Sequence, residues 1–462
     1  MKKENTKEPA TKTVGRPVGR PAGKTPKVAA KQLMKYVEEA KTPYHCVLES
    51  ERQLKAAGFK ELLAGGTWHL KEGGRYYVIP FPTCIFAFAV GDLKKKTGRG
   101  LHVAAAHTDY PCLHIKPGAE LTSGDYLKLN VEVYGGPILN TWFDRPLSIA
   151  GSVMLRSDDI YRPKRVVVDL ARPVITIPNQ AIHYNRDVNK GVELKKQIDL
   201  LPLFGMRKDA KGAGQGNPAA ASDFFLSFLA KELKVKKSDI LDFDLYVYNP
   251  EPPCLVGMNE EFISSPRLDN QTSCFALLRA MIEGTHKSGI DAIALFDNEE
   301  IGSTSKQGAD STLLSRLLEK LYASLGLSST KLCDDVTAGF LLSVDVAHAV
   351  HPNRADKFDP ANCAKTGDGV ILKMSINQRY SYDTEAVASI RQLLEANSIP
   401  YKKFVNHSDM AGGGTIGPII SSILPMKTVD TGVPILAMHS CREMMGAADQ
   451  YALERMVTKF FD

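Results

Sequence analysis

The 462-residue sequence contains no apolar run near the roughly 18 residues that a membrane-spanning helix needs. Its N-terminus is charged and rich in Pro and Gly, where a secretory signal would place an apolar segment. The eight cysteines are scattered and include no C-x-x-C pair, which excludes the pattern of a zinc ribbon or a disulfide framework. These absences predict reduced thiols, a cytoplasmic location and no membrane partner.

The formal net charge is +6, but most of the chain lacks an excess of basic residues. Residues 1–31 hold nine Lys and Arg against two Glu, so the remaining 431 residues sum to a net charge of −1. Such a body does not favour nucleic acid as a partner. Residues 1–27 have no aromatic residue and are predicted to be a disordered basic tail. Their two Gly-Arg-Pro repeats are similar to minor-groove AT-hook peptides, but Val14 and Val18 stand where that motif has Arg.

The rest of the chain has the composition of a folded protein, with 44% hydrophobic and 24% charged residues. Helical and strand patterns alternate over residues 28–117, and the same α/β rhythm returns over residues 255–462. Residues 118–254 instead show short alternating strands between Gly, Pro and Asn turns. We therefore expect one α/β domain in two parts, interrupted by a β-rich insert domain. A final helix is expected over residues 442–461.

Metal-binding residue types follow four of the apolar strand patterns. In an open α/β sheet, ligands bind outside the carboxyl ends of the strands, so these side chains are expected to converge. Histidine and carboxylate ligands without thiolates suit Zn²⁺, with Mn²⁺ or Co²⁺ as alternatives. The patterns are LHVAAA before His107, AIALF before Asp297-Asn-Glu299-Glu300, FLLSV before Asp345 and PILAM before His439, and Asp269 precedes the helix expected over residues 272–284.

Each of these residues alone has a simpler interpretation, as a loop histidine, a solvated acidic turn or a helix cap. Their joint position after strands favours a metal site. Asp109 lies two residues beyond His107, where its carboxylate can orient the imidazole. Ser440-x-x-Glu443 matches a capping box, which predicts a helix that begins directly after His439.

Seven motifs resemble those of the aspartyl aminopeptidases, which are dinuclear zinc aminopeptidases related to the vacuolar aminopeptidase of yeast. The resemblance runs from about Thr42 to the C-terminus. It implies a mixed-sheet α/β zinc-aminopeptidase catalytic domain that is interrupted by a β-rich, dimerisation-type insert. The motifs are HTDYPCLHIKP (107–117), TWFDRPLSIAG (141–151), SSPRLDNQTSCFALL (264–278), FDNEEIGS (296–303), SVDVAHAVHPN (343–353), SDMAGGGTIGPI (408–419) and AMHSCREM (437–444).

The resemblance also implies two Zn²⁺ ions per subunit, with a hydroxide that bridges them. Glu299 would be the general base, and Asp109, which can orient the imidazole of His107, would be the second catalytic residue. The implied metal ligands are Asp269 as the bridge, His107 and Asp345 for one ion, and Glu300 and His439 for the other.

The expected substrates are peptides with N-terminal Asp or Glu. The family places a basic and polar set around the acidic side chain, and the matching residues are His348, Lys373 and Tyr380. His183 matches an insert histidine that reaches a neighbouring subunit's active site, and relatives form dodecamers, so a homo-oligomer is expected. One position departs from the family pattern, because His407 stands where relatives commonly have Arg.

Two alternatives to this function stay open. The first keeps the two-metal core but changes the reaction, either to the removal of neutral N-terminal residues or to the deacylation of an amide. The second is a non-catalytic scaffold with a nucleic-acid-binding tail, which salt-dependent DNA retention would reveal.

Overall fold

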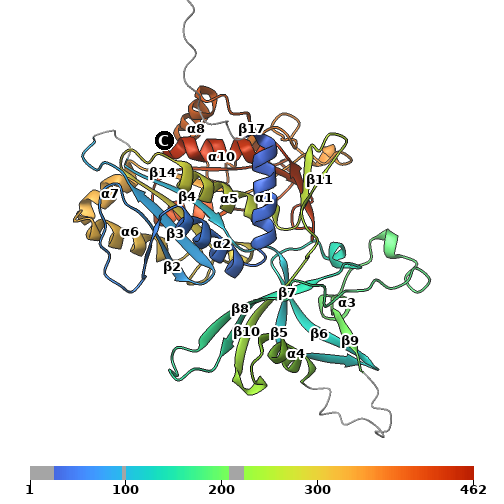
Figure 1. Cartoon of the computed structure of the whole chain (residues 1–462). Helices are drawn as coiled ribbons and strands as arrows, with labels where there is room; N and C mark the ends of the chain where they lie inside the picture. Colours follow the sequence, from blue (N-terminus) through green and yellow to red (C-terminus); the bar gives the residue numbers. More distant parts are fainter. Residues whose placement is uncertain (1–24, 96–99, 208–222) are drawn as a thin grey trace, which may run out of the picture.

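The computed structural model describes residues 25–95, 100–207 and 223–462 (Figure 1). Most of the predicted tail lies outside these ranges. The first helix, α1 (Pro26–Glu39), begins after Thr25, whose side chain accepts a hydrogen bond from the Val28 backbone N–H. Pro26 and Lys27 therefore belong to this helix rather than to the tail.

A nine-stranded mixed sheet forms the centre of the larger lobe, in agreement with the predicted fold class. Its middle strands, β13, β4 and β14, are neighbours and run parallel, whereas β3 and β16 join antiparallel neighbours. In spatial order the strands are β1 (Lys60–Leu62), β2 (Arg75–Phe81), β3 (Cys84–Val90), β13 (Ile290–Phe296), β4 (Leu101–His107), β14 (Phe340–Val344), β18 (Lys427–Gly432), β16 (Val370–Met374) and β17 (Tyr401–Val405).

Helices pack against both faces of this sheet because its central strands are apolar on both sides. Along β4, Ala104 and Ala106 contribute to one core, and Val103 and Ala105 contribute to the other. The first core also contains side chains of α1, α2 (Pro43–Ala56), α5 (Leu268–Glu283), α8 (Thr384–Ala396) and α10 (Asp449–Phe461). The second contains side chains of α6 (Leu313–Ser324), α7 (Ser329–Thr337) and α9 (Ile416–Ile423).

A six-stranded antiparallel sheet forms the smaller lobe, which lies below the larger one in Figure 1. Its own apolar core includes Phe225 and Leu229 of helix α4 (Phe224–Leu233). The predicted boundary at residue 118 falls within β5, and the division of the chain into domains stays a prediction. In spatial order the strands are β8 (Lys164–Asp169), β7 (Ser148–Leu155), β10 (Ile240–Tyr248), β5 (Cys112–Ser123), β6 (Tyr126–Tyr134) and β9 (Leu203–Met206), and the short helix α3 (Lys196–Asp199) packs beside β6.

A third, five-stranded sheet replaces part of the helix that was expected over residues 442–461. Glu443 begins strand β20, and the helix begins only at Asp449. The capping-box prediction is therefore wrong, because no helix follows His439 directly. The hydrophobic periodicity of the sequence also did not predict helices α7 and α9. In spatial order this sheet contains β11 (Cys254–Val256), β12 (Phe262–Ser265), β20 (Glu443–Gly446), β19 (Pro434–Leu436) and β15 (Ala347–His348).

Among the described residues, no helix combines the length and the apolar character that crossing a membrane requires.

Candidate metal centre and active site

Three of the predicted site segments lie at the same edge of the nine-stranded sheet. His107 is the last residue of β4, Asp345 directly follows β14, and Glu299 and Glu300 lie in a 3-10 turn, η5 (Glu299–Ile301), after β13. Because these three strands are parallel neighbours, their carboxyl ends bring the side chains together.

The other two candidate ligands, Asp269 and His439, do not follow strands of this sheet. Asp269 follows Arg267, which has a left-handed backbone with φ of 58°, and Asp269 itself has non-helical angles at the start of α5. The peptide bond between Asp269 and Asn270 is cis. His439 follows β19 of the five-stranded sheet and has φ of 68°. The expectation that all four strand ends belong to one sheet is therefore wrong for His439.

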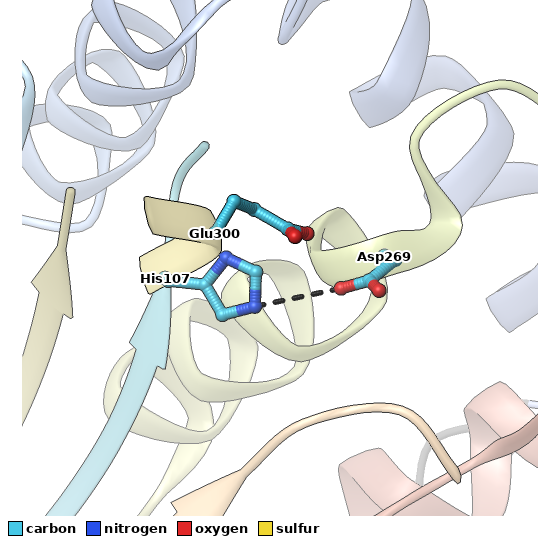
Figure 2. Close-up of side chains that lie close together, drawn as sticks. All are labelled: His107, Asp269 and Glu300. Carbon is cyan, nitrogen blue, oxygen red and sulfur yellow. Dashed lines mark ion pairs between the residues drawn. The ribbon is translucent and has the colours of Figure 1, made fainter. Parts of the chain in front are cut away.

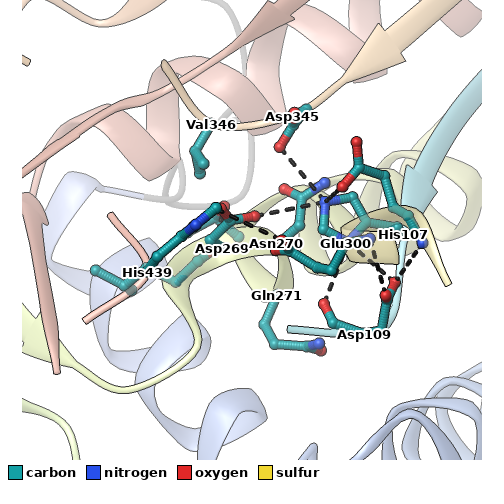
Figure 3. Close-up of polar contacts among 12 residues, drawn as sticks. His107, Asp109, Asp269, Asn270, Gln271, Glu300, Asp345, Val346 and His439 are labelled. Carbon is teal, nitrogen blue, oxygen red and sulfur yellow. Dashed lines mark hydrogen bonds and ion pairs between the residues drawn. The ribbon is translucent and has the colours of Figure 1, made fainter. Parts of the chain in front are cut away.

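The carboxylate of Asp269 lies between the two histidines (Figure 3). On one side, Nε2 of His107 lies 3.4 Å from Asp269 Oδ1 and 3.6 Å from Asp345 Oδ1. On the other side, Nε2 of His439 lies 3.4 Å from Asp269 Oδ2 and 3.6 Å from Glu300 Oε2. The five side chains therefore form two groups that share Asp269.

Both imidazoles are oriented in the way that metal-binding histidines usually are. Nδ1 of His107 donates to the Asp109 carbonyl oxygen at 3.1 Å, and Nδ1 of His439 donates to the Gly136 carbonyl oxygen at 3.1 Å. A carbonyl only accepts, so each neutral ring carries its proton on Nδ1 and its lone pair on Nε2. Both lone pairs thus face the carboxylates, with a backbone partner that fixes each ring.

Unpartnered carboxylate oxygens provide a test of whether these residues suit a metal ion. Asp269 Oδ1, Glu300 Oε1 and Asp345 Oδ1 are buried without a hydrogen-bond partner in the described part of the chain. Ligand atoms of His107, Asp269 and Glu300 all lie within 4.8 Å of one another (Figure 2). Buried anionic oxygens need a cation or a donor, and nitrogen with carboxylate oxygen is a donor set that Zn²⁺ accepts. The residues therefore fit zinc.

The electrostatics of the site also favour a cation. Burial alone would lower the pKa of His439, but the neighbouring carboxylates of Asp269 and Glu300 raise it to about 10. Burial would raise the pKa of Asp269, and the two histidines lower it instead. Burial together with the charge of Asp269 raises the pKa of Glu300 well above its usual range. Positive charge is thus stabilised at this point and crowded negative charge is not.

Glu299 lies beside the two groups rather than between them. Its Oε2 is 4.0 Å from Nε2 of His107, farther than Asp269 and Asp345 are. Burial raises its pKa to about 8, with further upward contributions from Asp345 and Asp109. A carboxylate whose pKa lies near neutrality can both accept and return a proton.

Asp109 holds the turn that carries the two glutamates. Its Oδ1 accepts the Glu299 backbone N–H and its Oδ2 accepts the Glu300 backbone N–H, both at 3.1 Å. Its Oδ1 also lies 3.3 Å from Nδ1 of His107. The sequence indicated only the contact with the histidine; the structure adds two contacts that position the glutamates.

Tyr134 connects the smaller lobe with this network. It ends strand β6, and its hydroxyl donates to Asp109 Oδ2 at 2.7 Å and accepts from Asn298 Nδ2 at 3.0 Å. Sequence reasoning missed Tyr134, because nothing in the β6 pattern distinguishes it from other strand tyrosines.

A cavity of about 630 Å³ is lined by the five candidate metal ligands. Its wall includes three of the predicted substrate-binding residues, His348, Lys373 and Tyr380. His183 does not line it; this residue is exposed in the loop between β8 and α3. The single chain thus brings together all the predicted site residues except His183.

Lys373 is a buried cation in the cavity wall, with 1% of its surface exposed. Its Nζ donates to the Val346 carbonyl oxygen at 3.0 Å and lies 3.4 Å from Asp345 Oδ2. It also lies 5.0 Å from the centre of the Tyr380 ring. Burial and the charge of Lys373 lower the pKa of His348, so this imidazole is neutral near pH 7.

The chain belongs to the Aminopeptidase I zinc metalloprotease (M18) family, whose model matches residues 36–461. It is therefore a metal-dependent aminopeptidase, a hydrolase of peptide bonds, and the family predicted from the motifs is confirmed. A probable M18 family aminopeptidase 2 of Clostridium novyi is 39% identical over 94% of this chain and 98% of its own length. Aspartyl aminopeptidase 4 of Saccharomyces cerevisiae is 37% identical over 94% of each chain.

Solved structures of this family share the fold. The chain aligns with the cryo-EM structure of the Ape4 and Nbr1 complex at a TM-score of 0.89 and 33% identity, over 95% of this chain and 87% of the other. It aligns with the S. cerevisiae mApe1 dodecamer at a TM-score of 0.78 and 25% identity, over 94% of this chain and 95% of the other. The predicted α/β catalytic fold is thereby confirmed.

Proposed function

We propose that this aminopeptidase removes N-terminal Asp or Glu from peptides and holds two zinc ions per chain. The observation that carries the choice of substrate is Lys373. Among the residues that the structure describes, it is the one Lys or Arg in the wall of the cavity, and it lies beside the carboxylate of Asp345. The aspartyl aminopeptidase of yeast among the relatives supports the same choice.

The two groups around Asp269 support two ions rather than one. Each group offers one imidazole nitrogen and one further carboxylate, and each uses a different oxygen of Asp269. In this arrangement Asp269 would be shared by both ions, His107 and Asp345 would hold one ion, and Glu300 and His439 would hold the other. Mn²⁺ and Co²⁺ accept the same donor set.

When bound, the zinc ions polarise the scissile carbonyl and lower the pKa of water at the site. Glu299 takes a proton from the attacking water and delivers it to the leaving amine nitrogen, so one water is consumed for each peptide bond. Asp109 keeps Glu299 in place through the backbone of the turn. As ligands, His107 and His439 would offer an unprotonated Nε2, because a carbonyl oxygen holds the proton on Nδ1 of each ring.

Lys373 can recognise an acidic side chain without leaving its present position. An ammonium group has three donors, and the structure gives Lys373 contacts to Val346 and Asp345. One donor remains for a substrate carboxylate, with Tyr380 and the neutral His348 beside it. An ion pair in this buried wall is stronger than a surface pair because the local dielectric is lower.

A preference for neutral N-terminal residues is the second candidate, and two observations favour it. Lys373 is already engaged with Asp345, and the cavity wall also contains Phe358, Ile419 and Met438. In that case Lys373 would serve only to hold Asp345 in place.

The wild-type chain is expected to hydrolyse substrates with N-terminal Asp or Glu at least about tenfold faster in kcat/KM than those with Ala, Leu or Lys. This ratio corresponds to roughly 1.4 kcal/mol of differential transition-state binding. Lys373→Met is expected to reduce the ratio and to change the hydrolysis of neutral substrates much less. The measurement is kcat/KM over a panel of aminoacyl substrates, with zinc content determined for each variant.

Lys459→Met is the matched control, because Lys459 is exposed on α10 and pairs only with Asp462 in the described structure. It should leave the ratio unchanged. A wild-type profile led by Leu or Lys would reject the acidic preference. If kcat/KM of Lys373→Met fell equally for all substrates and the variant also lost zinc, Lys373 would serve only to hold Asp345 in place.

We also propose a homo-oligomer, as large as a dodecamer, in which His183 completes the site of a neighbouring subunit. Its exposed position on the smaller lobe, away from the cavity of its own chain, supports this arrangement. The dodecamer of S. cerevisiae mApe1 is a related assembly. The expected cytoplasmic location stays a prediction.

Inactive His183→Ala and inactive Glu299→Gln are expected to regain part of the activity after their subunits are mixed. Mixed oligomers contain sites with an intact Glu299 and a neighbour's intact His183. Each variant taken alone through the same exchange procedure is the control. If labelled subunits exchange and no activity returns, His183 does not act across a subunit boundary.

A further inference from the structure

A buried carboxylate that belongs to neither metal group contacts the backbones of two candidate ligands. Glu443, the first residue of β20, is 3% exposed. Its Oε1 accepts the backbone N–H of His439 at 2.7 Å, and its Oε2 accepts the backbone N–H of Asp269 at 3.0 Å. These residues are 4 and 174 positions away in the sequence. One side chain therefore joins the backbones of two metal-binding residues from distant segments.

The backbones of these two residues leave the regular elements around them, and that of His439 has a rarely populated conformation. His439 has a left-handed φ of 68°, which residues with a Cβ rarely adopt. Asp269 has a φ of −77° and a ψ of 111° within the first turn of α5, two residues after the left-handed Arg267. A left-handed conformation such as that of His439 persists where the surrounding structure fixes it, and the same carboxylate accepts the amides of both His439 and Asp269.

Glu443 is held in place by the five-stranded sheet rather than by the metal-binding residues. Strand β20 pairs with β12 on one side and with β19 on the other, and Glu443 lies opposite Ser265 of β12. The sheet therefore fixes the backbone that carries this carboxylate.

We propose that Glu443 is a positioning residue for the metal centre. By accepting both amides, it sets the distance between Asp269 and His439 and directs the Asp269 carboxylate toward both imidazoles. This inference rests on the proposed function, because it takes Asp269 and His439 as zinc ligands. It assigns Glu443 no contact with zinc or substrate.

The chemistry of the side chain makes the proposal specific. Two amide donors need two acceptor oxygens, and a carboxylate supplies both. A glutamine of the same shape supplies one oxygen and places an NH₂ group against the other amide. Glu443→Gln therefore removes one of the two hydrogen bonds while it keeps the volume of the side chain.

The chain offers a matched control in Asp449, at the start of α10. It is also buried, and its two oxygens accept the backbone N–H groups of Gly367 and Gly369 at 2.8 and 2.9 Å. Neither glycine belongs to the metal centre. Asp449→Asn thus makes the same kind of change to a carboxylate that also joins two amides, without touching a metal-binding residue.

Zinc affinity of the full-length protein, measured by competition with a chromogenic chelator, tests the proposal. Loss of a partner that orients metal ligands typically lowers affinity about 10- to 100-fold, and we expect this loss for Glu443→Gln. For Asp449→Asn we expect a zinc affinity within about twofold of wild type, even where its Tm falls. Wild-type affinity in Glu443→Gln, or an equal loss in both variants, would overturn the proposal.

A second measurement needs no variant and covers the case in which Glu443→Gln does not fold. Hydrogen exchange of the metal-free wild type should show slow exchange at the amides of both Asp269 and His439. Exchange as fast as in an open loop at either amide would reject the positioning role. Failure of the proposed function would look different, because the wild type would then hold no zinc or Asp269→Ala would keep two ions.

Discussion

Glu299→Gln is expected to keep the zinc content of the wild type and to lose most of its turnover. Glutamine cannot accept the proton of the attacking water or return it to the leaving amine, and general acid–base catalysis contributes about 10²- to 10⁴-fold. Zinc should stay because Glu299 lies farther from His107 than Asp269 and Asp345 do. The measurements are kcat with an N-terminal Asp or Glu substrate and elemental analysis of the purified variant.

Glu319→Gln removes the same charge from an exposed position on α6 and is the control. It should have wild-type turnover. If Glu299→Gln retained tens of per cent of wild-type kcat, another group would have to be the base. If it lost zinc instead, Glu299 would belong to the ligands.

Asp269→Ala is expected to lose zinc at both positions, and His439→Ala is expected to lose it mainly at one. Asp269 offers Oδ1 to the group of His107 and Oδ2 to the group of His439, so its removal affects both. The loss of affinity should exceed the roughly 10- to 100-fold that the loss of an outer partner costs. Elemental analysis after dialysis against a weak chelator measures the zinc that remains per chain.

Asp335→Ala is the control for the loss of a buried carboxylate. Asp335 lies in α7 and accepts hydrogen bonds from Tyr322 of α6 and Lys331, and it is not part of the cavity wall. This variant should be less stable yet hold the wild-type amount of zinc. Two zinc ions per chain in Asp269→Ala would contradict the proposed ligand set.

The positions of His107, Glu300 and Asp345 could be expected from the sequence because a general rule applies to them. Apolar strand patterns precede all three, and parallel neighbours carry their ends to one edge. His439 follows an equally apolar pattern but comes from another sheet. Only the resemblance to known aminopeptidases indicated its partners, since strand order cannot be read from the pattern of one strand.

Glu443 shows why local patterns missed the support of the site. The spacing Ser440-x-x-Glu443 satisfies a capping box, and the structure uses the glutamate to accept the His439 amide without forming a helix. Its other partner, Asp269, is 174 residues away. A contact of that range arises from the packing of β20 beside β12, which no short segment of the sequence encodes.

Because the Tyr134 hydroxyl donates a hydrogen bond to Asp109, the two lobes are not independent of each other. Tyr134 belongs to the six-stranded sheet, yet it donates to Asp109, which in turn accepts the backbone N–H of Glu299, the proposed general base. Protein engineers who exchange the smaller lobe for that of a relative would therefore also exchange a residue that supports the turn of the proposed general base. Grafts that keep the end of β6 in register are expected to retain this connection.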